Sequence, residues 1–161
     1  MKKRLFLTMM LLSSFLGGST LTINAAAGLK AIWCRTAPTP TLYILYDDNE
    51  SYSAGGTYDG ITITAVYTDL GSLYNKGESG YTIGSTCKKV VIDESFQNSE
   101  RTYNSFMNLE KLTSITGLQY MITGYTTSMN NMFSNCKALT SIDLTGVNTS
   151  NVTDMTSAFY N

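Results

Sequence analysis

The feature that most constrains this chain is a short pattern that recurs at a nearly fixed distance. The stretches "SFMNLEKLTSI" (105–115) and "MFSNCKALTSI" (132–142) align with an offset of 27, and "TDMTSAFYN" (153–161) opens a third copy with an offset of 26. A unit of this size cannot bury its own apolar face and has to stack on its neighbours. The repeat therefore predicts that Phe106, Phe133 and Phe159 lie one above another.

Within the second copy, the apolar residues are spaced by three, three, three and then two. They are Phe133, Cys136, Leu139, Ile142 and Leu144. Steps of three place side chains on one side of a tight helical turn, whereas a step of two belongs to a strand. The spacing predicts a short helical turn followed by a short strand, with all five side chains facing one interior. Cys136 replaces Leu109 of the first copy, so we expect a small buried hydrophobe at this position.

The amino-acid sequence of the repeat resembles that of a known family of repeats. "MFSNCKALTSIDLTGVNTSNVTDM" (132–155) is similar to the repeat of BspA-like leucine-rich repeat surface proteins of bacteria. Upstream, "TLYILYDD" (41–48) and "KKVVIDESF" (88–96) resemble the segment that precedes the repeats in that family. The resemblance implies a surface protein that mediates adhesion to proteins of a host or of neighbouring cells.

These observations predict an α+β chain in two parts. A small β-rich cap covers 28–95, and the beginning of a leucine-rich repeat solenoid covers 96–161, with a short strand and a short helix in each 26–27-residue unit. The solenoid would hold about two units and the start of a third, so the chain looks truncated. In the cap, "TLYILY" (41–46) and "ITITAVYT" (61–68) are rich in β-formers and are expected to pair as a hairpin or meander, with a third strand over 89–93.

The first 27 residues read as a secretory signal peptide. Lys2, Lys3 and Arg4 precede an apolar run, and small residues lead up to Ala27, where we expect cleavage. No later stretch has membrane-spanning length, so the leader predicts a secreted or surface-exposed protein. The resemblance implies that this protein is bacterial. After the expected leader, the chain has no Lys/Arg cluster that would favour nucleic acid. Cys34, Cys87 and Cys136 form an odd set, and the sequence leaves a Cys34–Cys87 bridge open.

The residue types that support catalysis are scarce. The chain has no His, which removes Ser-His and Cys-His activation and the commonest metal ligand. We therefore expect no enzyme activity, no catalytic or metal-binding residues and no cofactor.

What remains is a strip of outward side chains that would bind protein ligands and, as a further option, glycans. The strip consists of Thr113, Ser114, Thr116, Thr140, Ser141, Asp143 and Thr145. Two alternatives stay open: a structural spacer of a larger surface protein, and a carbohydrate-binding module in the tyrosine-rich β unit. The tyrosines of that unit are Tyr43, Tyr46, Tyr52, Tyr58 and Tyr67.

Overall fold

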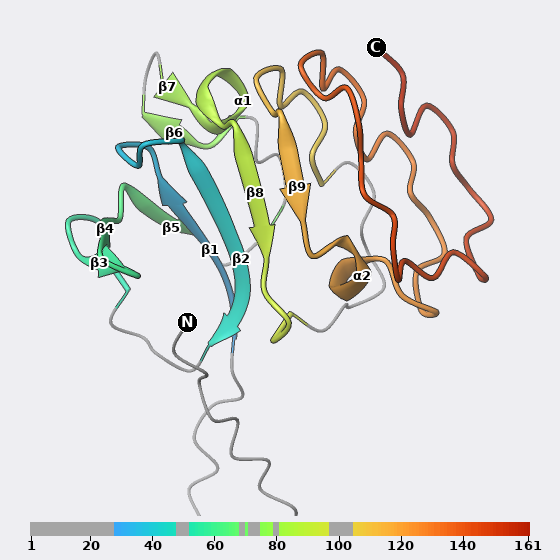
Figure 1. Cartoon of the computed structure of the whole chain (residues 1–161), viewed down its shortest axis with the longest axis horizontal. Helices are drawn as coiled ribbons and strands as arrows, with labels where there is room; N and C mark the ends of the chain where they lie inside the picture. Colours follow the sequence, from blue (N-terminus) through green and yellow to red (C-terminus); the bar gives the residue numbers. More distant parts are fainter. Residues whose placement is uncertain (1–27, 48–51, 68–69, 71–74, 79–80, 97–104) are drawn as a thin grey trace, which may run out of the picture.

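The computed structural model describes residues 28–47, 52–67, 70, 75–78, 81–96 and 105–161, so the expected signal peptide lies outside it. Its centre is a mixed sheet of five strands in the order β5-β1-β2-β8-β9 (Figure 1). The strands are β1 (Gly28–Cys34), β2 (Thr41–Asp47), β5 (Ala65–Tyr67), β8 (Lys89–Ile92) and β9 (Ser114–Thr116). The predicted fold class, a β cap followed by a leucine-rich repeat solenoid, is therefore wrong.

Strand β1 was not predicted, and its presence changes the pairing of the other strands. It runs antiparallel to β2 along its whole length and takes β5 on its other side. The expected hairpin between "TLYILY" and "ITITAVYT" does not form, because both segments pair with β1 instead. The connection between β1 and β2 holds Pro38 and Pro40, whose fixed φ and missing N–H end regular pairing there.

The far side of the sheet is parallel. β8 pairs with β2, and β9 pairs with β8, both in parallel register. A parallel pair needs a crossover connection rather than a tight turn. The crossover from β2 to β8 carries the short pairs β3 (Thr57–Tyr58) with β4 (Ile61–Thr62) and β6 (Gly77–Glu78) with β7 (Tyr81–Thr82), followed by α1 (Ile83–Thr86).

The two faces of the sheet carry different apolar clusters. The larger cluster runs across position 95 without a break and includes Trp33, Leu42, Ile44, Val90, Ile92, Ile115 and Leu118. The smaller cluster, on the other face of β1 and β2, consists of Ile32, Cys34, Leu45 and Ile63, with the β3–β4 pair packed against it. Since Cys34 and Cys87 belong to different clusters, they do not face each other, and all three thiols are free.

The repeat region does not form the predicted units of a short helix and a short strand. Residues 105–108 and 131–135 are turns rather than helices, and 139–144 form no strand. Asn108, Asn131 and Asn135 adopt φ values of 62°, 51° and 58°, in the left-handed region that interrupts a right-handed helix. The four-residue α2 (Leu118–Met121) follows β9, where no helix was expected. Among the described residues, no helix is long and apolar enough to cross a membrane.

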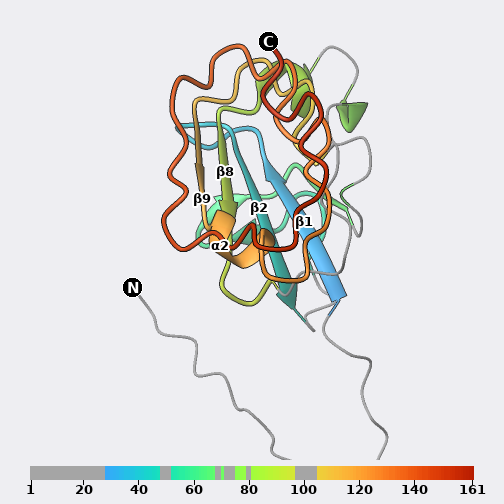
Figure 2. The ribbon, with the colours of Figure 1, turned by 90° about the vertical axis from the view of Figure 1, so that its right-hand side faces the viewer.

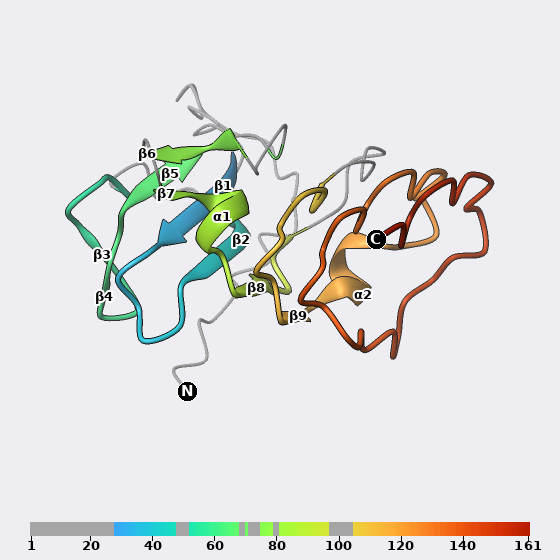
Figure 3. The ribbon, with the colours of Figure 1, turned by 90° about the horizontal axis from the view of Figure 1, so that it is seen from above.

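The stacking of the three phenylalanines is nevertheless observed. The ring centroids of Phe106 and Phe133 lie 5.6 Å apart, and those of Phe133 and Phe159 lie 5.4 Å apart, with interplanar angles of 19° and 13°. Figure 1 shows the turns that carry them arranged side by side beyond β9, with 153–161 outermost. Seen from above, the same turns extend away from the sheet (Figure 3). The stack is thus built from turns joined side by side.

Candidate binding surface

The seven residues of the predicted strip are all exposed. Ser114 and Thr116 flank Ile115, which is only 6% exposed, so the alternation of β9 turns their side chains outward. The next turn repeats this arrangement, because Thr140 and Ser141 follow Thr113 and Ser114 by 27 residues. The strip therefore crosses from β9 onto the neighbouring segment of the chain.

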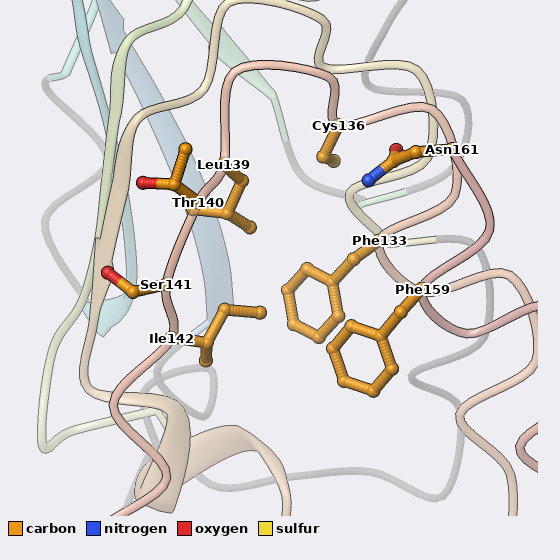
Figure 4. Close-up of a pocket in the computed structure, with 8 residues that line it drawn as sticks. All are labelled: Phe133, Cys136, Leu139, Thr140, Ser141, Ile142, Phe159 and Asn161. Atoms are coloured by element: carbon orange, nitrogen blue, oxygen red, sulfur yellow. The ribbon is translucent and has the colours of Figure 1, made fainter.

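An apolar pocket lies next to the segment that carries Thr140 and Ser141. In Figure 4, Leu139 and Ile142 point toward Phe133, whereas Thr140 and Ser141 point away from it. The pocket has a volume of about 230 Å³ and is also lined by Cys136 and Phe159. Leu144 was expected to face this interior but is 50% exposed, which corrects the predicted apolar stripe at its last position.

The hydrogen bonds of the strip leave most of its hydroxyls available to a ligand. The Thr113 hydroxyl donates to the Lys88 carbonyl at 2.9 Å. The hydroxyls of Ser114, Thr116, Thr140 and Ser141 have no partner within the described part of the chain. A hydroxyl both donates and accepts, so these four groups can bond to backbone or side-chain atoms of a ligand.

Asp143 supplies the negative charge of the strip. Its Oδ1 accepts the backbone N–H of Thr145 at 2.9 Å. This bond, together with the Thr145 side chain, holds the pKa of the Asp143 carboxyl below its usual range. The same local bond occupies the Thr145 N–H, and such side-chain bonds compete with strand pairing. Asp143 is thus an exposed anion in a segment that does not form a regular strand.

The sheet register places three further residues beside the strip, of which the sequence analysis had named only Tyr43, and that as a possible glycan contact. Lys89 lies beside Ser114 and Val91 beside Thr116, and Tyr43 of β2 lies beside Val91. All three additional side chains are half-buried. The alternation in "KVVI" shows which residues share a face, but the parallel pairing that brings β8 between β2 and β9 has no local signal in the sequence.

The tyrosines proposed as a glycan platform do not form one surface. Tyr43, Tyr52 and Tyr58 belong to the smaller cluster, and their rings contact one another with centroid distances of 5.0 and 5.7 Å. Tyr46 and Tyr67 pack against the larger cluster on the opposite face. Tyr46 contacts Phe96, and Lys76 lies over the Tyr67 ring. The rings are therefore engaged in packing on two sides of the sheet.

The described residues hold no group of three or more His, Cys, Asp or Glu side chains that could bind a metal ion. The thiols are protonated at neutral pH, because burial raises the pKa of Cys87 to about 12 and that of Cys136 to about 11. Cys136 is 1% exposed and its thiol donates to the Phe106 carbonyl at 3.1 Å, which confirms the prediction of a small buried residue. A protonated, buried thiol is a poor nucleophile.

Comparisons of this chain with protein-family models, curated proteins and solved structures find no match.

Proposed function

We propose that this chain is an exported bacterial surface protein that binds protein ligands through the strip of Thr113, Ser114, Thr116, Thr140, Ser141, Asp143 and Thr145. The observation that carries the proposal is the exposure of all seven side chains on two adjacent segments. The leader-like 1–27 and the similarity of 132–155 to the repeats of BspA-like surface proteins support an exported, adhesive role.

The chemistry of the strip fits weak, repeated contacts. A single hydrogen bond contributes about 0.5–1.5 kcal/mol net, because the same groups bond to water before binding. Four free hydroxyls and one carboxylate therefore give modest affinity to an isolated molecule. Many copies on one cell surface would raise the effective affinity without any new contact. Adhesion between cells is the setting in which such a surface works.

The test uses the full chain in solution and on a sensor surface. Immobilised extracellular-matrix proteins, whole bacterial cells and a glycan array are probed with the wild type and with a double variant, Ser114→Arg with Ser141→Arg. Ser150→Arg is the matched control, since Ser150 is an exposed serine outside the strip. Retention of protein or cell binding by the control and its loss in the double variant supports the proposal.

Three results would contradict it. Equal binding by all three proteins would place the contact elsewhere. Selective binding to sugars that survives the double variant and is lost on Tyr58→Ala would favour a carbohydrate-binding module. The absence of any ligand, with the chain intact on the cell surface, would favour the structural spacer.

A further inference from the structure

Lysines from three separate segments of the chain lie together at one edge of the sheet. Lys88 precedes β8 and Lys89 opens it. The Lys88 carbonyl accepts from the backbone N–H of Thr113 at 2.9 Å, immediately before β9 begins. The turn at 110–111, which holds Lys111, therefore lies at the same edge, directly before the start of β9.

The next turn of the stacked region adds a fourth lysine to this edge. Lys137 stands 27 positions after Glu110, and its Nζ lies 2.9 Å from the Glu110 carboxylate. The ion pair places Lys137 beside the turn that holds Lys111. Both partners stay exposed, with 60% of the Lys137 side chain and 50% of the Glu110 side chain accessible to solvent. The lysine edge, as we call it, consists of Lys88, Lys89, Lys111 and Lys137.

Strand direction explains why these cations share one edge. Because β2, β8 and β9 are parallel, they all begin at the same edge of the sheet, which is the upper edge in Figure 1. This edge stays uppermost when the molecule is turned about the vertical axis (Figure 2). Asp93 and Glu94 follow β8 and therefore lie at the opposite edge. Charge is thus separated across the sheet, and the lysine edge has a local positive potential that the formal net charge of −1 does not reveal.

The chemistry of lysine indicates which anions this edge suits. Lys88, Lys111 and Lys137 are exposed, and Lys89 is half-buried. A lysine ammonium is a compact point charge with three donors and binds phosphate-like oxyanions, whereas arginine matches a planar carboxylate with two parallel bonds. Arg35 follows β1 at this edge, but its Nε is buried. The exposed cations therefore fit sulfate or phosphate groups better than carboxylates.

Hydroxyl groups border the lysine edge on the face of the sheet. Ser114 lies beside Lys89 in the register of β8 and β9. Thr140 and Ser141 follow Lys137 by three and four residues on the neighbouring segment. All three hydroxyl side chains are exposed. Since a hydroxyl both donates and accepts, these groups can bond to the hydroxyls of a sugar.

We propose that the lysine edge binds an anionic polysaccharide, whose sulfate or phosphate groups contact the lysine ammonium groups while its sugar hydroxyls bond to the bordering serine and threonine side chains. A single exposed ion pair contributes little to affinity. A polymer that carries a charge on many of its sugars contacts several lysines at once, so the weak contacts combine. The inference adds a second class of ligand beside the polar strip and stands whether or not the strip binds protein.

The test measures binding of the full chain to defined polymers by isothermal titration calorimetry at low and at physiological salt. Heparin supplies sulfate groups and phosphomannan supplies phosphate groups, so the two arms separate the two sources of this chemistry. Uncharged dextran and poly-L-glutamate are the reference polymers. We expect binding to at least one of the two anionic polysaccharides and none to dextran. The binding should weaken as salt rises, because exposed charges are screened.

A gain of affinity is the most specific readout, since a misfolded variant does not produce one. Glu110→Gln removes the carboxylate that neutralises Lys137, so it should raise the affinity about twofold. Glu94→Gln is the matched control, because it removes the same charge from an exposed position at the opposite edge. It should leave the affinity unchanged.

Loss of affinity gives the second readout. Lys111→Gln should weaken binding about twofold, and the addition of Lys88→Gln should bring the loss to about fivefold. Lys30→Gln is the control, since Lys30 pairs with Leu45 near the opposite edge of the sheet. Three results would overturn the inference: no binding to either anionic polysaccharide at low salt, equal affinities of the two glutamine variants of the preceding test, or binding of poly-L-glutamate as tight as that of the polysaccharides, which would identify an acidic polypeptide as the ligand.

Discussion

Replacing Gly117 by alanine tests how tightly the parallel strands β8 and β9 are held together. Gly117 follows β9 with a φ of 84°, a conformation that costs a residue with a Cβ about 1–2 kcal/mol. The added Cβ would lie 2.0 Å from the Ile92 carbonyl oxygen and 2.9 Å from its carbon. Because these atoms are backbone, relief requires a shift of β8 or β9, which we expect to cost about 1–3 kcal/mol more.

Gly55→Ala is the matched control for this prediction. Gly55 has nearly the same φ, 85°, but an added Cβ would meet nothing within 4 Å. Urea unfolding followed by the fluorescence of the single, fully buried Trp33 measures both variants. With a slope of about 1–3 kcal/mol per molar urea, the midpoint of Gly117→Ala should fall about 1 M further than that of Gly55→Ala. Equal midpoints would refute the close approach of Gly117 to Ile92.

Three further predictions concern the stacked turns and the thiols. Phe133→Ala should lower the free energy of unfolding by about 3–5 kcal/mol in the same urea assay, because the ring is 1% exposed and stacks on both sides. Stability should fall as pH rises from 9 toward 11–12, since the buried thiols of Cys87 and Cys136 keep their protons in the folded state while those of the unfolded chain, with a pKa near 9.0, lose them. Urea midpoints across this range check it, and Cys87→Ala should flatten the decline. Lys137→Ala should leave the midpoint unchanged, because its 2.9 Å ion pair with Glu110 is exposed and screened by water; a clear loss would show that the pair couples the two turns.

The sequence predicted the structure best where the same residue types recur every 26–27 positions. The 27- and 26-residue offsets predicted the stack of Phe106, Phe133 and Phe159. The place of Cys136 in the apolar spacing of the repeat predicted its burial. The third strand was predicted over 89–93 and is found at Lys89–Ile92. In each case the pattern reports which side chains face the interior, which is what hydrophobic spacing encodes.

Backbone pairing was harder to predict, for physical reasons. The sequence "GLKAIWC" does not predict that β1 pairs with a strand on each side, because strand order depends on tertiary packing. Three-residue spacing cannot separate a helical turn from the turns with left-handed asparagines found here.

The continuity of the larger apolar cluster across position 95 has a practical consequence for dissecting the protein. β8 lies on one side of that position and β9 on the other, and Val90 and Ile92 share a core with Ile115 and Leu118. A fragment cut at 95 would leave the β8 edge unpaired and its inner side chains in water. The two parts are not interchangeable modules, so functions should be separated by point substitutions in the intact chain rather than by deletion.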